Sequence, residues 1–484
     1  MNKKLLLLLL FSPLVKAETI VEFDQDQKEF NHDRQAVEFD QDQKEFNHDR
    51  QAVEFEQKIV KNTQKSTAYL PDEQVTESVE QQINQAILTQ NWEKLEILLT
   101  AYSMQQQADP LLLDYASAAL AYAKKDHRSA IFYYQQLLKK QPSFIYPRFD
   151  LALILKEDFR YREAQKEFEQ LKTTASHNLH ATINNALEQM AEEEQWKPDF
   201  YLQYTQTNNV NNAASSPIVN INGRIFHKAE ESLPQSAKGF RYGVGLSKMQ
   251  NVSGNHFIGA DLAYNGVYYW NNQDYSEQVL SITPSYSYRK ATYRIGLSPF
   301  IEQNWLGSSR DNYQFGGRVN VMKLFERGMV SGSFSHTQKR YFDTATAEYY
   351  NSYRNQVTVG TQWQAVKNWR FFANVMANRE IAREKAQSSN KWLATIGVIH
   401  QTQRWSSSAS VGYGKRYFAD KHYLFDYKRQ DKEYQANVAV WNQNWHWNGI
   451  VPKLNFRYQK IDSNIADFYS RSNKEVFLTV EKVF

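Results

Sequence analysis

Histidines are the first place to look for catalysis or metal binding, because imidazole acts as a base and as a metal ligand near neutral pH. His177 and His180 form an HxxH pair in a polar turn, and His446 stands between two tryptophans. No constellation of serine, histidine and acid is legible around them, and HxxH without further ligands is a weak metal motif. We therefore expect no enzyme, no metal site and no cofactor.

Cysteine content, the N-terminal segment and net charge exclude several classes of function. The chain has no cysteine, which excludes disulfides, thiol catalysis, thiolate metal sites and lipid attachment through an N-terminal cysteine. Residues 1–17 are predicted to be a secretory signal peptide, with two lysines in Met1–Lys4 and an apolar run from Leu5 to Val15. Its three lysines take the formal charge from +4 to +1, which argues against nucleic-acid binding.

Residues 18–74 are predicted to be a disordered or weakly helical leader. The segment VEFDQDQKEFNHDRQA at 21–36 recurs letter for letter at 37–52. Each copy offers only valine and phenylalanine to a core among many charged and amide side chains, too little to offset the entropy of folding. His32 and His48 recur in identical settings, and we expect them to be solvated rather than bound to metal.

Residues 75–195 have helical chemistry, with few glycines and with apolar residues three and four positions apart. A 34-residue register relates Ala118 to Ala152, Ala130 to Ala164, Tyr134 to Phe168 and Leu137 to Leu171. This register resembles tetratricopeptide repeats, whose arrays bind peptides or proteins on a concave face. Six residues are expected on that face, although each could equally pack between helices: Tyr115, Ala119, Tyr122, Tyr146, Phe149 and Leu153.

Residues 198–484 alternate between apolar and polar side chains along membrane-length segments. In 257–270, for example, Ile258, Leu262 and Tyr264 share one face and Asp261 shares the other with Asn265. Two-faced strands that end in aromatics are typical of transmembrane barrels, whereas a large secreted sandwich is the competing fold. Short turns at every second connection favour the barrel. The expected fold class is α + β multidomain, an α-helical tetratricopeptide-like domain followed by an antiparallel β-barrel of about 14 strands.

The polar face of such strands lines the barrel interior. Nine charged residues are expected there: Asp261, Arg294, Glu302, Arg318, Arg370, Glu380, Arg416, Lys453 and Arg457. They could set ion selectivity, yet a polar lumen is a property of any barrel of this size. The long connections at 209–238, 340–350 and 419–430 are expected at the outer end.

The stretch TNNVNNAAS at 207–215 and the ending DSNIADFYSRSNKEVFLTVEKVF at 462–484 resemble short patterns of the surface lipoprotein assembly modifiers of Gram-negative bacteria. The terminal Phe484 also resembles the sorting signal of outer-membrane barrels. The order of helical repeats and barrel fits that family, while the duplicated leader departs from it.

The resemblance implies an outer-membrane protein, its helical domain in the periplasm, that moves client lipoproteins or secreted haem-binding proteins to the cell surface. The helical domain would engage the client, with periplasmic chaperones as further partners, and the barrel would provide the route. Outer-membrane lipid and the barrel-assembly machinery would be further partners. The family brings no catalytic residues with it.

Three other functions fit parts of the sequence. Polysaccharide exporters also join helical repeats to outer-membrane barrels, but they predict a longer array than two clear repeats. A passive porin would use the charged lumen and would not need the helical domain. A barrel phospholipase is the remaining enzymatic alternative.

Overall fold

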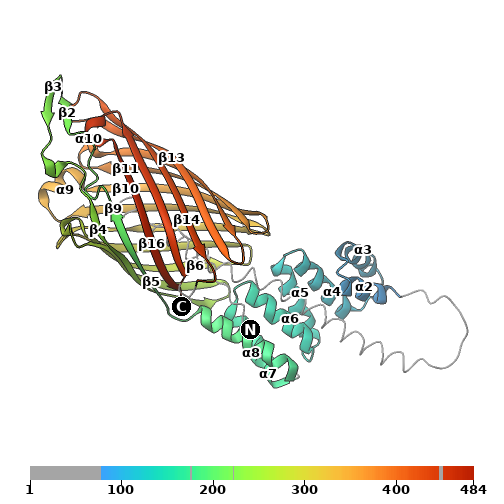
Figure 1. Ribbon diagram of the computed structural model, residues 1–484. Coiled ribbons are helices and arrows are strands. Elements are labelled where there is room, and N and C mark those ends of the chain that lie inside the picture. The colour runs from blue at the N-terminus through green and yellow to red at the C-terminus, as the bar shows by residue number, and fades with distance from the viewer. Residues whose placement is uncertain (1–77, 175–176, 222, 446–450, 484) are drawn as a thin grey trace, which may run out of the picture. The chain divides into compact units, whose positions relative to one another are not determined.

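The computed structural model describes residues 78–174, 177–221, 223–445 and 451–483. The expected signal peptide and leader lie outside these ranges, and so do His32, His48, His446 and Phe484. The chain divides into a helical unit and a strand unit (Figure 1), and each is described by itself.

The helical unit consists of consecutive helices joined by short turns. They are α2 (Val79–Leu88), α3 (Trp92–Ser103), α4 (Pro110–Ala123), α5 (His127–Lys140), α6 (Ile145–Glu157), α7 (Tyr161–Thr174) and α8 (His177–Glu193). Their starts follow local capping chemistry, since Asp109 accepts a hydrogen bond from the Leu111 amide with Pro110 in the first turn. Asp126 caps α5 in the same way through the Ser129 amide. Among the described residues, no helix has the length and apolar character needed to cross a membrane.

The 34-residue register occupies the core of this unit. All eight register positions are no more than 3% exposed: Ala118, Ala130, Tyr134, Leu137, Ala152, Ala164, Phe168 and Leu171. Alanines at the helix crossings let the backbones approach, and the aromatic and leucine positions fill the space between successive helix pairs. The predicted tetratricopeptide-like repeat is therefore confirmed.

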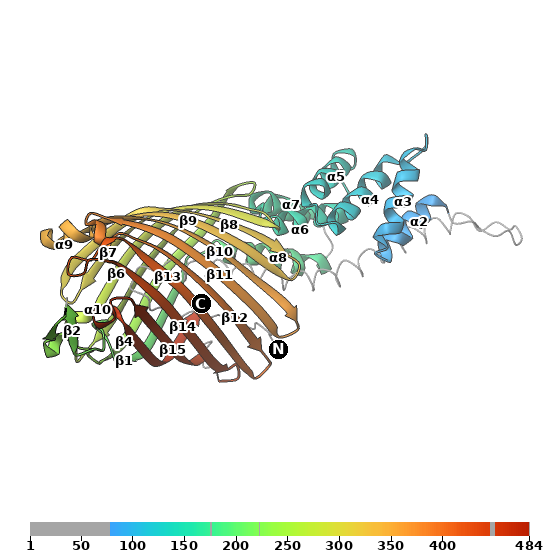
Figure 2. The same ribbon diagram turned by 90° about the horizontal axis from the view of Figure 1, so that it is seen from above.

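The strand unit is a closed antiparallel barrel of fourteen strands (Figure 2), which confirms the predicted fold class. The strands are β1 (Lys197–Thr207), β4 (Ala237–Ser253), β5 (His256–Tyr269), β6 (Glu277–Arg289), β7 (Tyr293–Leu306), β8 (Ser309–Phe325), β9 (Gly328–Tyr341), β10 (Ser352–Val366), β11 (Trp369–Ala382), β12 (Ser389–Gln401), β13 (Trp405–Lys421), β14 (Lys428–Asn442), β15 (Val451–Ser463) and β16 (Arg471–Val483). Each pairs with its neighbours in the chain, and β16 closes the barrel on β1 from Asp199 opposite Val483 to Tyr204 opposite Leu478.

Alternation along the strands gives the barrel an apolar outside. Ile258, Leu262 and Tyr264 of β5 are 54%, 45% and 37% exposed, whereas Phe257 on the opposite face of the same strand is 2% exposed. Closure satisfies the backbone groups of every strand, which is the condition for placing a sheet in lipid. The strand pattern read from the sequence therefore corresponds to an outside that faces hydrocarbon and an inside that is polar.

Several short elements lie at the end of the barrel away from its two termini, hereafter the far end. These are the hairpin β2 (Ile218–Ile221) with β3 (Arg224–His227), α9 (Thr344–Tyr350) and α10 (Ala466–Tyr469). The sequence predicted only long loops at 209–238 and 340–350, because four to seven residues are too few to show a period. The expected loop 419–430 is shorter than predicted, since β13 continues to Lys421 and β14 begins at Lys428. One far-end connection is a tight turn, in which Gly307 takes a φ of 58° between β7 and β8.

Candidate functional site

The charged residues expected in the barrel interior lie on the inward face of their strands. Glu302, Arg318, Arg370, Lys453 and Arg457 are less than 10% exposed, and Asp261, Arg294, Glu380 and Arg416 are half-buried. Each alternates with outward neighbours that are more exposed, as Arg318 (5%) does with Val319 (41%). Their use as the lining of a route stays a prediction.

Further charged residues face inward that were not predicted from the sequence. Arg241 of β4, Arg289 of β6, Lys391 of β12 and Glu475 of β16 are 4%, 8%, 5% and 2% exposed. The alternation along each strand could have identified them, since each occupies the same face of its strand as the inward apolar or small residues.

Among the side chains that the structure describes, cations outnumber carboxylates at the inward positions of the regular ladders. The cations are Lys197, Arg241, Arg289, Arg294, Arg318, Lys339, Arg354, Arg370, Lys391, Arg416, Lys453, Arg457 and Arg471. The carboxylates are Asp199, Asp261, Glu277, Glu302, Glu380, Asp431, Glu433 and Glu475. The described wall therefore carries a net positive charge, and its field is focused inside a low-dielectric shell.

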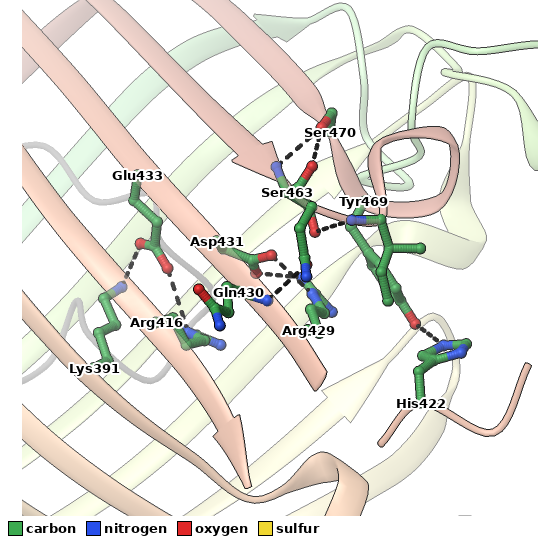
Figure 3. A network of polar contacts seen from close by, with 12 residues as sticks. Lys391, Arg416, His422, Arg429, Gln430, Asp431, Glu433, Ser463, Tyr469 and Ser470 are labelled. Atoms are coloured by element: carbon green, nitrogen blue, oxygen red, sulfur yellow. Dashed lines mark hydrogen bonds and ion pairs between the residues drawn. The ribbon is translucent and has the colours of Figure 1, made fainter. Parts of the chain in front are cut away.

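Glu433 of β14 is the centre of an inward ion-pair group (Figure 3). Lys391 Nζ lies 2.6 Å from Glu433 Oε2, and Arg416 Nε lies 3.3 Å from Glu433 Oε1. Lys391 and Arg416 are directly opposite each other on β12 and β13. One carboxylate thus compensates two adjacent cations from neighbouring strands, which would repel each other without it.

A second group gathers where β14 reaches the far end. Arg429 holds Asp431 through two contacts, Nε to Oδ1 at 3.0 Å and Nη2 to Oδ2 at 2.6 Å (Figure 3). The same guanidinium lies over the ring of Tyr469, 3.5 Å from its centroid, and over Phe418 at 4.5 Å. A bidentate ion pair stacked between two aromatic rings fixes the end of β14 against α10.

His422 extends this group into the connection between β13 and β14. The Leu424 amide donates to His422 Nδ1 at 3.2 Å, so the proton sits on Nε2, which donates to the Tyr469 hydroxyl at 2.8 Å. Burial lowers the pKa of His422, and the charge of Arg429 lowers it further. The ring therefore stays neutral and serves as a structural hydrogen-bonding group.

The hairpin β2–β3 packs on the same far-end group through an apolar cluster. Val219, Phe425 and Ile465 are 4%, 8% and 3% exposed and contact one another. The Asn220 amide donates to Asp467 Oδ2 at 3.3 Å, and the Lys228 ammonium donates to the Asp467 carbonyl. Three connections that are distant in sequence thus form one packed structure at the far end.

The six residues expected on a concave helical face divide into two sets. Ala119, Phe149 and Leu153 are 5%, 0% and 5% exposed and belong to the core, where Phe149 meets Phe168 edge to face at 6.0 Å. Helical periodicity alone does not separate a concave surface from the packing between helix pairs, so these three side chains do not form an accessible face. Tyr115, Tyr122 and Tyr146 are half-buried and keep accessible surface.

Tyr122 is tied into a polar network between two repeats. Its hydroxyl donates to Glu157 Oε2 at 2.9 Å, and its ring meets His127 edge to face. His127 Nε2 lies 3.0 Å from Glu157 Oε1, and His127 Nδ1 lies 3.2 Å from the Lys125 carbonyl. Burial lowers the pKa of His127, but attraction to Glu157 outweighs burial and raises it overall. For Glu157, burial acts to raise the pKa of the carboxyl group. The hydrogen bond and the charge of His127 outweigh burial, so the pKa of Glu157 is lowered overall.

The expected histidine pair lies at the start of α8. His177 is its first residue and His180 is half-buried one turn on. Within the described ranges, no group of three histidine or carboxylate side chains is arranged to hold a metal ion. His446 lies outside the described residues.

Comparison with known proteins matches both units to one family. A model described as surface lipoprotein assembly modifier matches residues 196–484, and the model of the N-terminal TPR repeats of surface lipoprotein assembly modifier matches 69–168. The outer membrane channel DcaP of Acinetobacter baumannii is a more distant likeness, 10% identical, with a TM-score of 0.35 over 60% of this chain and 97% of its own.

Curated relatives are similar over most of their length. Surface lipoprotein assembly modifier 1 of Haemophilus influenzae (strain Rd) is 26% identical, over 82% of this chain and 83% of the relative. The surface lipoprotein assembly modifier of Pasteurella multocida is 26% identical, over 81% and 80%. The hemophilin secretion modulator of Acinetobacter baumannii is 23% identical, over 88% and 91%.

These matches agree with the geometry of the barrel. Its closed sheet and apolar outside place it in the outer membrane, with the N-terminal repeats in the periplasm. The barrel end that carries β1's start and β16's end is then periplasmic, and the far end is external. Because one family model covers more than half of the sequence, the chain belongs to the surface lipoprotein assembly modifier family.

Proposed function

We propose that this protein moves a client across the outer membrane to the cell surface, the client being a surface lipoprotein or a related secreted haem-binding protein. The observation that carries the proposal is that both units match models of one family, whose relatives are named for surface lipoprotein assembly and hemophilin secretion. In this proposal the helical repeats engage the client in the periplasm and the barrel provides the route. No step in it requires catalysis.

The helical unit supports the capture step through its accessible aromatic surface. Tyr115, Tyr122 and Tyr146 are half-buried on α4 and α6, the first helices of successive pairs. Tyrosine offers a large contact area and a hydroxyl at little entropic cost, so it suits the binding of an extended polypeptide. Ala119, Phe149 and Leu153 support the same face from within as core residues.

The barrel interior supports passage of a polypeptide rather than of an apolar solute. Small polar side chains line part of the wall at inward positions of β9 and β13: Ser331, Ser333, Ser335, Ser406, Ser408 and Ser410. Serine hydroxyls both donate and accept, so they can satisfy the backbone groups of a chain in transit. The cationic residues on the remaining wall would hold acidic stretches of a client.

Other partners belong to the same proposal. A signal peptide over residues 1–17 would export the chain, and the barrel-assembly machinery would insert it among outer-membrane lipids. Periplasmic chaperones would bring the client to the helical unit, with residues 18–74 as a spacer.

Site-specific photo-crosslinking during transport tests the proposal. Gln314 of β8 faces inward at 3% exposure, and its neighbour Phe315 faces outward at 39%, so the pair is a matched comparison. A photoreactive amino acid at 314 should capture a co-expressed client lipoprotein, and the same group at 315 should not. Equal capture at both positions, or capture at 315 alone, would exclude the lumen as the route.

A further inference from the structure

The outward face of the barrel carries an arc of five cations along β11 to β16. The arc consists of Arg379 on β11, Lys415 on β13, Lys432 on β14, Lys460 on β15 and Lys474 on β16. Figure 2 shows β11 to β15 side by side, and β16 follows β15 in the sheet. Each of the five stands on the outward parity of its strand, as Lys474 does two positions before Val476, which is 56% exposed.

All five cations stand at one height. They lie nine or ten residues from the periplasmic end of their strands, counted from Trp369, Trp405, Asn442, Val451 and Val483. At about 3.4 Å per residue and a tilt of about 40°, this places them roughly 25 Å above that end, the height of the apolar band of such barrels. The arc therefore lies where hydrocarbon gives way to the headgroups of the outer leaflet.

The matching outward positions of β4 to β10 carry no charge, and the nearest outward cation among the described residues is Arg340, two positions beyond Gln338 on β9. The outward residues nine or ten positions from the periplasmic end of β4 to β10 are Val244, Gly266, Leu280, Gln303, Phe315, Gln338 and Val357. The cations are thus not a general feature of the interface, which any barrel could carry for snorkelling. They form a local patch.

Apart from Lys460, the cations of the arc are not paired with carboxylates of the described strands. Lys415 and Lys432 are directly opposite each other on neighbouring strands, where like charges destabilise a sheet. Across the described outward positions of β11 to β16, Asp462 is the sole carboxylate, and it pairs with Lys460 at 2.9 Å. In that part of the chain no ion pair joins Lys415, Lys432 or Lys474 to an acid. An external anion would remove the repulsion.

Aromatic rings lie beside and beneath the cations. Trp392, Tyr413 and Tyr434 form a row on β12 to β14, with centroids 5.6 Å and 5.2 Å apart. Trp392 and Lys432 flank Lys415 on the neighbouring strands. Aromatic rings at the interface with ammonium groups above them suit a ligand that has sugar rings or acyl chains below and phosphate above.

We propose that this arc binds the phosphorylated headgroup of an outer-leaflet glycolipid. The two facing lysines supply charge-assisted hydrogen bonds to a phosphate, Lys474 and Arg379 extend the positive surface to either side, and the aromatic row contacts the sugar. The site holds a defined lipid against β11 to β16 and is independent of the client.

Lipid retention by the purified full-length protein in detergent tests this site. The probes are diphosphorylated lipid A, its fully dephosphorylated form and inorganic phosphate. We expect the triple variant Lys415→Gln, Lys432→Gln and Lys474→Gln to bind diphosphorylated lipid A at least about tenfold more weakly, since each surface cation attracts an anionic headgroup. Lys323→Gln is the control, because Lys323 is an exposed outward lysine near the periplasmic end of β8.

Three outcomes of this experiment would overturn the proposed lipid site. Equal binding of lipid A by the wild type and the triple variant would overturn the site, and so would equal binding of the phosphorylated and dephosphorylated lipids by the wild type. Inorganic phosphate bound as tightly as lipid A would make free phosphate the ligand and overturn the assignment to lipid. If the glutamine variant fails to fold, the corresponding arginine variant should retain binding, and the comparison of the two lipids on the wild type still tests the site.

Discussion

Arg457 of β15 and Glu475 of β16 form an ion pair across neighbouring strands inside the barrel. Arg457 Nη1 lies 3.2 Å from Glu475 Oε2, and the two side chains are 4% and 2% exposed. The guanidinium also lies over Phe477, 5.1 Å from its centroid, and Nε donates to Asn437 Oδ1 at 3.3 Å. Because β16 also closes the barrel on β1, this pair fixes the inward side of the closing strand.

Removing one partner of this pair should destabilise the barrel strongly. We expect Glu475→Gln to lower the free energy of unfolding by about 3–5 kcal/mol, because it leaves a buried guanidinium without a counter-charge. The double variant Arg457→Met with Glu475→Gln should recover part of the loss. The measurement is urea unfolding of the refolded protein in detergent, and a double variant less stable than the single one would contradict the argument.

The closing register can be tested with cysteines, since the chain has none of its own. Gln203 of β1 is directly opposite Thr479 of β16, and both face inward. Gln203→Cys with Thr479→Cys should form a disulfide on oxidation, because directly opposite positions on paired strands are within disulfide reach. The control pair, Gln203→Cys with Phe477→Cys, is offset by two residues and should remain reduced. A shift in gel mobility reports the crosslink, and crosslinking of the offset pair alone would show a different register.

The helical repeats should be pH-sensitive through His127 and Glu157. The pKa of His127 is raised above its usual 6.5, so its contribution is complete below pH 6.5 and is lost as the pH rises through the raised pKa. The pKa of Glu157 is lowered below its usual 4.5, so its contribution holds above pH 4.5 and is lost as the pH falls through the lowered pKa. Amide hydrogen exchange in the full chain should show α5 and α6 most protected between pH 4.5 and 6.5. His127→Gln should remove the loss at higher pH, and an unchanged profile in this variant would exclude the pair as its cause.

Truncating a core aromatic of the helical unit should reduce stability far more than truncating a surface aromatic. Phe149 is fully buried, so Phe149→Ala should cost about 3–5 kcal/mol through lost contacts and a cavity. Phe132 of α5 is 53% exposed, so Phe132→Ala should change stability by no more than about 0.5 kcal/mol. Thermal unfolding of the full-length variants, followed by helical circular dichroism, measures both, and similar losses would contradict the placement of Phe149.

The inward excess of cations should make any ion current through the barrel anion-selective. In planar bilayers under a KCl gradient, the reversal potential should favour chloride, and Arg416→Glu should shift it toward potassium. The outward Lys323→Gln is the matched control and should leave the potential unchanged. A cation-selective wild type would contradict the charge distribution assigned to the wall.

Much of the barrel could be predicted from the sequence because its signal is local and repeated. Alternation with period two identifies each strand and its inward face, so Arg318 and Lys453 could be placed by parity alone. The partners of these charges could not be predicted, since Lys391 meets Glu433 from two strands away and the contact depends on register. The hairpin β2–β3 was missed for a similar reason, because it is held by long-range contacts such as Asn220 with Asp467.

In the helical unit, the buried positions could be predicted from the sequence and the accessible positions could not. Its 34-residue register predicts the buried alanines and aromatics correctly, since helix pairs repeat the same contacts. The accessible face could not be resolved in the same way. Phe149 and Tyr146 lie within one turn of α6, yet the first is fully buried and the second half-buried, and the difference depends on the neighbouring repeat rather than on the local sequence.

Protease shaving of intact cells shows whether a candidate client lipoprotein, expressed together with this protein, reaches the cell surface. We predict cleavage of that lipoprotein at the surface of cells that contain this protein and protection in cells that lack it. Deleting residues 79–193 should restore protection while the barrel still inserts, as judged by its heat-modifiable mobility. A lipoprotein cleaved equally with and without this protein would contradict the account.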